Sequence, residues 1–341
     1  MPRPDDLLGV LLKQVSRSFY LSLSILPASV REPIGLAYLL ARASDTVADT
    51  RLIARAERIA HLETLRQAYV GGAADLGAIA RACAPVQHQA AERSLLERVE
   101  EIVRRADALA DGDRSHVRAV LATITAGQLF DLQRFPGEDA AALGALDTPD
   151  ELDRYTYLVA GCVGEFWTRL HVAHRPRLAR WPLDVAVPRG IRFGKALQLT
   201  NVLRDIPADL RNGRCYLPAR DLAEIGLTPA DLVTDAGART ARPLVHRWIG
   251  VALQHYEVAW QYTLAIPRAE FRMRLACAWP LLIGLGTLAA LAGHGNPVAA
   301  STPVKLPRAA VRGLVMRSAL TVWSNAALGR DAARLRARIA I

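Results

Sequence analysis

The sequence is poor in lysine and in aromatic residues. Only Lys13, Lys195 and Lys305 are lysines among 43 basic residues, and aromatic residues make up 6% of the 341 positions. Few aromatic residues together with abundant alanine favour helix over strand. The net charge of +10 therefore depends on arginine. No basic run has aromatic neighbours, so we expect no nucleic-acid partner, whereas an anionic small molecule or membrane surface suits the charge.

Cysteine is scarce as well. The four cysteines are far apart and form no CxxC pair, which excludes a disulfide scaffold and a zinc site from our expectations. The first ten residues contain two aspartates and lack the basic and apolar regions of a signal peptide. We therefore expect a protein of the reducing cytoplasm.

One uncharged stretch, residues 275–293, approaches the length of a membrane span. Pro280, Gly284 and Gly286 interrupt it, and its high alanine content keeps the hydrophobicity modest. We expect a buried helix or a broken helix pair here, with a membrane-anchored or lipid-binding scaffold as the alternative.

Helical periodicity dominates the chain, and no alternating runs of strand length recur. We find no internal repeat and no flexible linker, so we predict a single all-α domain over residues 1–341. The expected helices span 5–16, 31–50, 51–70, 92–110, 114–134, 151–174, 189–210, 242–265, 268–293 and 307–337.

The most informative segment is residues 32–50. Tyr38, Arg42, Asp45 and Asp49 are spaced by 4, 3 and 4 residues, which places them within about 60° of arc on one helical face. Their neighbours are apolar, and two carboxylates at i and i+4 repel one another. A divalent cation between them removes the conflict, and a site of oxygen ligands suits Mg²⁺.

A second segment has the same design. Gln198, Asn201, Asp205 and Asp209 are spaced by 3, 4 and 4 residues and align within about 80°. Pro207 is a discordant residue, because it removes a backbone donor between the two aspartates.

A single DxxxD is ordinarily an exposed pair of helical aspartates. Two such pairs, each in an apolar helix and each beside an arginine (Arg42 and Arg204), instead indicate a site for metal and diphosphate.

The chain resembles the squalene/phytoene synthase family of head-to-head prenyl transferases. The resemblance runs from residue 15 to about 310. The matching stretches are VSRSFYLSLSILP at 15–27, YLLARASDTVAD at 38–49, YTYLVAGCVGEFWTRL at 155–170, LQLTNVLRDIPADLRNGRCYLP at 197–218 and, more loosely, CAWPLLIGLGTL at 277–288.

This resemblance implies an isoprenoid-synthase type helical bundle around a central cavity. It implies that the four aspartates, Asp45, Asp49, Asp205 and Asp209, hold Mg²⁺ that bridges to substrate diphosphates. Arginine offers a bidentate fork to phosphate oxygens. The implied diphosphate ligands are Ser16, Arg17, Ser18, Arg42, Gln198, Asn201 and Arg204; for Arg214 an ordinary surface role is as good an interpretation.

The resemblance also assigns Tyr155 to the first half-reaction and Tyr38 to a place near the first aspartates. A tyrosine ring can stabilise a carbocation and its hydroxyl can relay a proton, although a core role for both tyrosines is the alternative. We expect Gly161 and Gly164 to let a prenyl chain pass close to the backbone. Lys305 and Arg308 loosely match a basic pair for the NADPH phosphate, or are two surface cations.

The implied activity is that of a bacterial-type squalene synthase, which joins two farnesyl diphosphates through presqualene diphosphate and reduces the product with NADPH. The first motif begins Asp-Thr, where carotenoid-type members usually begin Asp-Asp. The alternatives are an enzyme that stops at presqualene diphosphate or forms hydroxysqualene, a dehydrosqualene- or phytoene-type synthase, and a non-catalytic assembly protein. We expect a cytoplasmic protein with possible peripheral contact at the inner face of the membrane.

His171 and His174 form an HxxH pair with no third ligand nearby in the sequence, and we expect a surface pair. We assign no role to Glu165.

Overall fold

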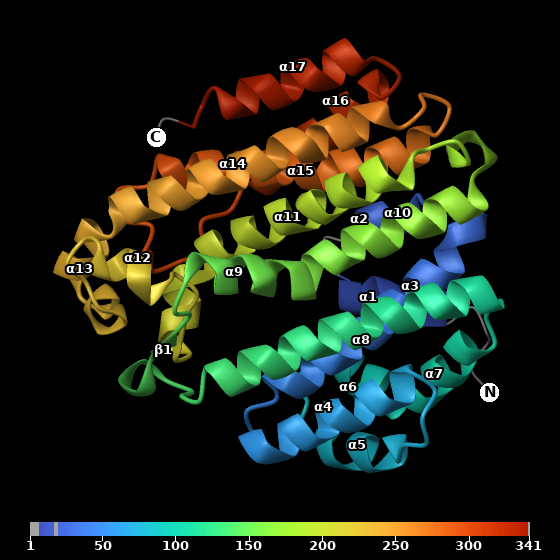
Figure 1. The fold of residues 1–341 in the computed structure, drawn as a ribbon, viewed down its shortest axis with the longest axis horizontal. Helices are drawn as coiled ribbons and strands as arrows, with labels where there is room; N and C mark the ends of the chain where they lie inside the picture. Colours follow the sequence, from blue (N-terminus) through green and yellow to red (C-terminus); the bar gives the residue numbers. More distant parts are fainter. Residues whose placement is uncertain (1–6, 17–19, 340–341) are drawn as a thin grey trace. The chain divides into compact units, whose positions relative to one another are not determined.

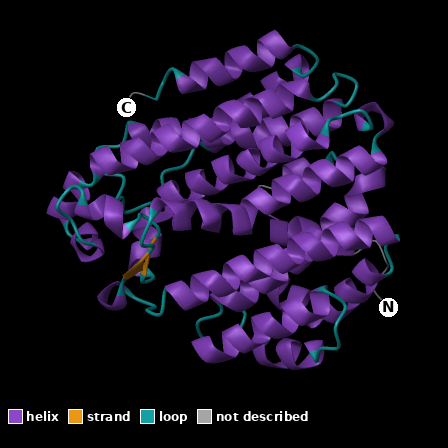
Figure 2. Cartoon of the chain, in the orientation of Figure 1, coloured by secondary structure: helices purple, strands orange, loops and turns teal. Residues whose placement is uncertain are grey.

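A computed structural model describes residues 7–16 and 20–339. Helices make up nearly all of the regular structure (Figure 2), which confirms the all-α prediction. The chain divides into two compact units, the first made of Met1–Leu132 with Phe166–Trp181 and the second of Gln133–Glu165 with Pro182–Ile341. That the whole chain acts as one domain stays a prediction.

The first unit is built around α3 (Ala28–Asp49), whose leucine, valine and alanine side chains are buried on most of its circumference. Helices α1, α4, α6 and α7 all pack on α3. The elements of this part of the chain are η1 (Leu7–Leu11), α1 (Leu12–Ser16), α2 (Tyr20–Ser24), α3, α4 (Arg55–Tyr69), α5 (Leu76–Cys83), α6 (Ala90–Glu97), α7 (Val99–Asp107), α8 (Asp111–Arg134) and η5 (Pro176–Leu178).

The second unit has α11 (Leu183–Arg211), α14 (Arg242–Ala265) and α15 (Phe271–Ala292) side by side as its core (Figure 1). Two short parallel strands pair Gly144 with Arg214. The other elements are η3 (Ala140–Ala142), β1 (Gly144–Ala145), α9 (Pro149–Thr156), η4 (Tyr157–Gly161), β2 (Arg214–Cys215), α12 (Ala219–Ala223), η6 (Pro229–Val233), α13 (Asp235–Thr240), α16 (Arg308–Thr321) and α17 (Asn325–Arg336). Helix α10 (Cys162–His174) begins in this unit, and its residues from Phe166 onward belong to the first unit.

Helix α15 contains most of the uncharged stretch. It is long and apolar enough to cross a membrane, but 78% of its most apolar window is buried inside the molecule, as a core helix requires. This confirms the expected buried helix. The expectation of a broken pair was wrong, because α15 continues through Pro280.

Small residues in α15 make room for side chains of neighbouring elements. A Cβ at Gly284 would lie 1.8 Å from the Tyr256 hydroxyl, and one at Gly286 would lie 2.5 Å from Leu306. The Tyr256 hydroxyl is 2.8 Å from the Thr200 hydroxyl on α11. Thus α11, α14 and α15 meet at a buried polar contact.

Some expected helices are divided in the structure. The stretch 92–110 forms α6 and α7, which meet at Arg98, and the stretch 307–337 forms α16 and α17. Ser324 causes the second division, since its hydroxyl accepts a hydrogen bond from the Ala327 amide and caps the start of α17.

Arg274 is fully buried in α15 and joins three helix ends. Its Nε donates to the Val322 carbonyl at 2.9 Å, and its Nη1 donates to the Ile266 carbonyl at 2.6 Å. Its Nη2 donates to Asn325 Oδ1 at 2.6 Å. Val322 and Ile266 are the C-cap residues of α16 and α14, so the cation lies where two helix dipoles present partial negative charge.

We predict that Arg274→Met lowers the free energy of unfolding by about 3 kcal/mol, because it leaves buried carbonyls without a donor. Urea unfolding followed by circular dichroism measures this change. Arg272→Met, at an exposed position of the same helix, is the matched control and should change stability by less than about 0.5 kcal/mol. Equal effects of the two substitutions would contradict the structural role of Arg274.

Candidate functional site

The first acidic pair lies at the C-terminal end of α3, as the spacing predicts. Arg42, one turn before Asp45, forms an ion pair with Asp45 at 2.5 Å from Nη1 to Oδ2. Its Nη2 donates to Glu92 Oε1. Its Nε is buried and has no hydrogen-bond partner among the described residues. Burial alone would lower the pKa of Arg42, but the charges of Asp45 and Glu92 raise it, so the guanidinium stays charged.

The neighbouring carboxylates favour the charged form of Arg42 but disfavour the charged form of Asp45. Desolvation, followed by the charge of Asp49, raises the pKa of the Asp45 carboxyl to about 6. Arg42 opposes this shift, and Glu92 adds to it. The side chain keeps 45% of its surface accessible, so we regard repulsion from the neighbouring carboxylates as the firmer cause of the shift. A cation bound here would relieve that repulsion.

Glu92 is a member of this cluster that the sequence did not reveal. It lies on α6, 50 residues beyond Arg42, and only 14% of its side chain is exposed. No motif joins the two positions. The only available signal was an acidic residue in the first turn of a short amphipathic helix.

The second acidic pair lies on α11, which continues without interruption through Pro207 to Arg211. Asp205 and Asp209 therefore share one helical face. Arg204 holds Asp205 with a two-pronged contact, in which Nε donates to Oδ1 at 2.8 Å and Nη2 donates to Oδ2. Hydrogen bonding to Asp205 and the charge of Asp209 raise the pKa of Arg204. The backbone donor missing at Pro207 therefore does not break the helix between the two aspartates.

One turn earlier on the same face, Asn201 Nδ2 donates to Gln198 Oε1 at 3.4 Å. Both side chains are partly exposed. Their amides extend the polar stripe of Asp205 and Asp209 along an otherwise apolar helix. This stripe is the arrangement that the spacing predicted.

Tyr155 belongs to an aromatic cluster in the second unit. Its ring stacks on Tyr216 with centroids 4.8 Å apart, and the two hydroxyls are 3.3 Å apart. Phe135 meets Tyr216 edge to face at 5.1 Å. Tyr216, directly after β2, is a second residue that we did not single out from the sequence.

The helix that carries Tyr155 is not regular. After α9 the backbone widens into the π-helix η4, and α10 follows. Single π-turns within helices occur frequently at functional sites. The helix expected over 151–174 is therefore continuous, with a π-turn between α9 and α10.

Gly164 serves helix packing. A Cβ there would lie 1.8 Å from the Gly190 carbonyl oxygen, and a Cβ at Gly194 would lie 2.1 Å from the Ala160 carbonyl oxygen. The backbones of α11 and of the η4–α10 segment thus touch. The expectation that Gly164 opens a path for a prenyl chain was wrong. A Cβ at Gly161 would lie 3.2 to 3.4 Å from side-chain atoms of Tyr157, Ile191 and Lys195.

The remaining predicted residues lie as follows. The Ser16 hydroxyl is buried and donates to the Leu12 carbonyl at 2.5 Å, and Tyr38 is partly buried on α3. Lys305 and Arg308 are exposed beside the start of α16. Arg17 and Ser18 lie outside the described residues. Since α3 belongs to the first unit and α11 to the second, a site that uses both acidic pairs stays a prediction.

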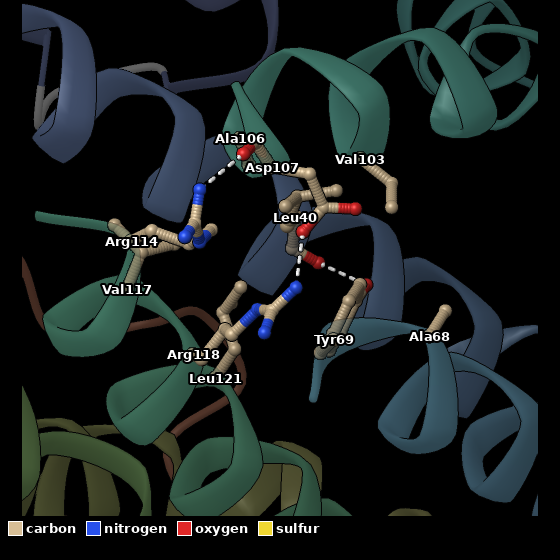
Figure 3. Close-up of a pocket in the computed structure, with 10 residues that line it drawn as sticks. All are labelled: Leu40, Ala68, Tyr69, Val103, Ala106, Asp107, Arg114, Val117, Arg118 and Leu121. Atoms are coloured by element: carbon tan, nitrogen blue, oxygen red, sulfur yellow. Dashed lines mark hydrogen bonds and ion pairs between the residues drawn. The ribbon is translucent and has the colours of Figure 1, made fainter. Parts of the chain in front are cut away.

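A small pocket in the first unit has charged walls but holds none of the predicted residues (Figure 3). Arg118 donates to Asp107 at 2.8 Å, and Arg114 donates to Asp111 at 2.5 Å. Tyr69 donates to the Leu40 carbonyl at 2.8 Å. Arg118 is thus paired within the lining, whereas the carboxylate that pairs with Arg114 lies outside it.

The acidic pairs have the donor set that Mg²⁺ prefers. Each supplies two carboxylates from one helix face, which leaves most coordination positions to water and phosphate oxygens. The described residues hold no group of three or more His, Cys, Asp or Glu that could enclose a metal ion. That the acidic pairs hold Mg²⁺ stays a prediction.

The HxxH pair is not a surface pair, contrary to our expectation. His171 is fully buried, with Nδ1 2.9 Å from the Trp167 carbonyl and its ring 4.4 Å from the Trp167 ring. His174 Nε2 lies 2.7 Å from Asp113 Oδ1. Burial first, and then the charges of Arg175 and His174, lower the pKa of His171 from 6.5 to about 4.

We predict that this histidine makes the protein sensitive to acid. Between pH 6.5 and 4 an unfolded His171 takes up a proton and the folded one does not, so the free energy of unfolding falls as the pH falls, by up to about 3 kcal/mol. Urea unfolding from pH 7 to 4.5 should show a shallower pH dependence for His171→Gln. Parallel curves for the two proteins would contradict the assignment.

Comparison with known proteins shows the family to which the chain belongs. A model of the squalene/phytoene synthase family matches residues 12–310. The chain therefore belongs to the squalene/phytoene synthase family, whose members are prenyltransferases that condense isoprenoid diphosphates head to head. The acidic pairs of α3 and α11 both lie inside the matched region.

Individual relatives differ in their products. The presqualene diphosphate synthase of Rhodopseudomonas palustris is 30% identical over 267 residues, which are 76% of this chain and 77% of that protein. The phytoene synthase of Arthrospira platensis is 37% identical over 139 residues, which are 39% of this chain and 42% of that protein. This second match thus spans less than half of the relative's length.

A solved structure of TcSQS with the ligand E5700 has a TM-score of 0.77 at 22% identity, and the match covers 98% of this chain and 91% of that chain. At this identity the likeness establishes the fold, which is the all-α isoprenoid-synthase fold. The central cavity implied by the resemblance stays a prediction.

Proposed function

We propose that this chain is a squalene synthase that condenses two farnesyl diphosphates to presqualene diphosphate and then reduces this intermediate to squalene with NADPH. One observation carries the proposal. Within a family of head-to-head synthases, this chain keeps two acidic pairs, and each has a carboxylate paired with an arginine on an apolar helix. A non-catalytic assembly protein would have no use for either pair.

The aspartates would hold Mg²⁺, namely Asp45 and Asp49 on α3 and Asp205 and Asp209 on α11. When bound, Mg²⁺ stabilises the negative charge of diphosphate as it leaves the allylic carbon. Within the first cluster desolvation, followed by the charges of Asp49 and Glu92, raises the pKa of Asp45. The carboxylates thus lie close enough to repel one another, and a bound cation would offset this repulsion.

The arginines bind and orient the diphosphate in this proposal. Arg42 and Arg204 are each paired with the aspartate nearest to them, and a guanidinium released from that carboxylate presents a planar fork to phosphate oxygens. Glu92 would keep Arg42 in place during such an exchange, because it holds the other terminal nitrogen.

The aromatic cluster would contact the hydrocarbon part of the substrate. Tyr155 and Tyr216 stack with hydroxyls 3.3 Å apart, and both are at least nine-tenths buried. A buried aromatic surface excludes water that would capture an allylic cation and presents π faces that stabilise it. The paired hydroxyls can hold or pass on a proton.

The reductive step is the finer part of the proposal. Lys305 and Arg308 are exposed and form no ion pair among the described residues, so their charges are free to meet the phosphate of NADPH. The alternatives remain a synthase that stops at presqualene diphosphate or forms hydroxysqualene, and a dehydrosqualene- or phytoene-type synthase. We further propose a cytoplasmic location next to the inner face of the membrane, since the hydrocarbon product is insoluble in water.

The product assay tests the proposal. Purified protein incubated with farnesyl diphosphate and Mg²⁺ should accumulate presqualene diphosphate, and added NADPH should convert the product to squalene, as gas chromatography with mass spectrometry would detect. An identical hydrocarbon with and without NADPH would overturn the reductive step. Consumption of geranylgeranyl diphosphate alone would favour a phytoene-type synthase.

A second prediction addresses the acidic pairs. Asp45→Asn and Asp205→Asn should each lower kcat at least about 100-fold, because each removes one charge from a cation site. Asp184→Asn changes an exposed aspartate in the first turn of α11 and serves as the control, with activity near that of the unchanged protein. Circular dichroism should show intact folds. Near-normal turnover in either of the first two variants would refute the two-pair site.

A further inference from the structure

The second unit exposes an apolar patch on α16 and beside it. Met316 and Leu320, one turn apart on α16, are 64% and 77% exposed, and Trp323 just after the helix is 54% exposed. The Trp323 ring lies 6.0 Å from the ring of Phe271, another exposed aromatic residue, at the start of α15. We call these four side chains, with Arg312 one turn before Met316, the α16 surface.

The stretch of sequence that carries this surface has charges of one sign. No aspartate or glutamate occurs from residue 271 to residue 330. The basic residues of this stretch are Arg272, Arg274, Lys305, Arg308, Arg312, Arg317 and Arg330, and all of them except the buried Arg274 are exposed. Arg312 has no ion-pair partner among the described residues, and the nearest contact of Arg317 with an acid is 3.9 Å to Asp331. Positive charge thus remains available beside the apolar side chains.

The opposite face of α16 fixes the helix to the unit. Leu314 and Ser318 are buried, and the Ser318 hydroxyl accepts a hydrogen bond from Trp279 Nε1 of α15 at 3.0 Å. Figure 1 shows α16 and α17 next to α14 and α15. The exposed side chains are therefore presented on a supported helix and are not the unpacked face of a loose one.

We propose that the α16 surface docks on an anionic lipid bilayer. Apolar side chains surrounded by arginines suit the boundary between acyl chains and negatively charged headgroups, and tryptophan is favoured at that depth. A second copy of the chain is a poorer occupant, because two copies of this surface would bring like charges together. The inference is independent of the proposed reaction, since binding is measured without substrate.

The test is flotation of the full chain with vesicles made of phosphatidylcholine alone or of equal parts phosphatidylcholine and phosphatidylglycerol. We expect binding to the anionic vesicles that weakens as salt is raised. Leu320→Glu should lower the partition coefficient at least about tenfold, and Arg312→Ser about fivefold. Val233→Glu, at a 52% exposed position elsewhere in the same unit, is the matched control and should leave binding unchanged.

Tryptophan fluorescence with brominated phosphatidylcholine in the vesicles locates the contact. Quenching should be largely lost in Trp323→Phe, whose position at the surface leaves the core intact. Several outcomes overturn the proposal: no binding to anionic vesicles, equal loss in Leu320→Glu and Val233→Glu, or quenching that persists without Trp323. Lipid-free self-association that Leu320→Glu abolishes would assign the surface to a second copy.

Discussion

The pairing of a carboxylate with a guanidinium on an apolar helix is the constraint on which the rest of this structure depends. Two aspartates one turn apart repel each other, and the apolar surroundings increase that repulsion. Arg42 and Arg204 offset it for Asp45 and Asp205. Each unit thereby holds an acidic pair in place through one arginine, which is itself fixed by the carboxylate that it contacts.

The helix of the second unit that carries these charges, α11, is supported by its packing on neighbouring helices. In the second unit α11 packs along α14 and α15 through apolar side chains, with one hydroxyl pair, Thr200 and Tyr256, inside the contact. Space for that tyrosine exists because Gly284 has no side chain. Arg274 then joins the ends of α14 and α16, so a single buried cation fixes the far end of the same helix group.

Much of this could be predicted from the sequence, because helical spacing is a local property. The shared faces of α3 and α11 followed from intervals of three and four residues, and an unbroken α11 shows that Pro207 did not disturb them. Contacts between distant segments could not be predicted. Glu92 reaches Arg42 across 50 residues, Tyr216 reaches Tyr155 across 61, and the burial of His171 depends on tertiary packing. Gly164 was assigned to substrate for the same reason, since only the fold reveals the α11 backbone beside it.

The π-helix η4 sets the rotational phase between two contacts of one continuous helical segment. Tyr155 lies before it and Gly164 after it, and each added or removed residue turns the following helix by about 100°. With the wider turn in place, the tyrosine reaches its aromatic partners while the glycine lies against the α11 backbone. The irregular turn thus lies between two contacts of the same helical segment, the stacking of Tyr155 on Tyr216 and the packing of Gly164 against α11.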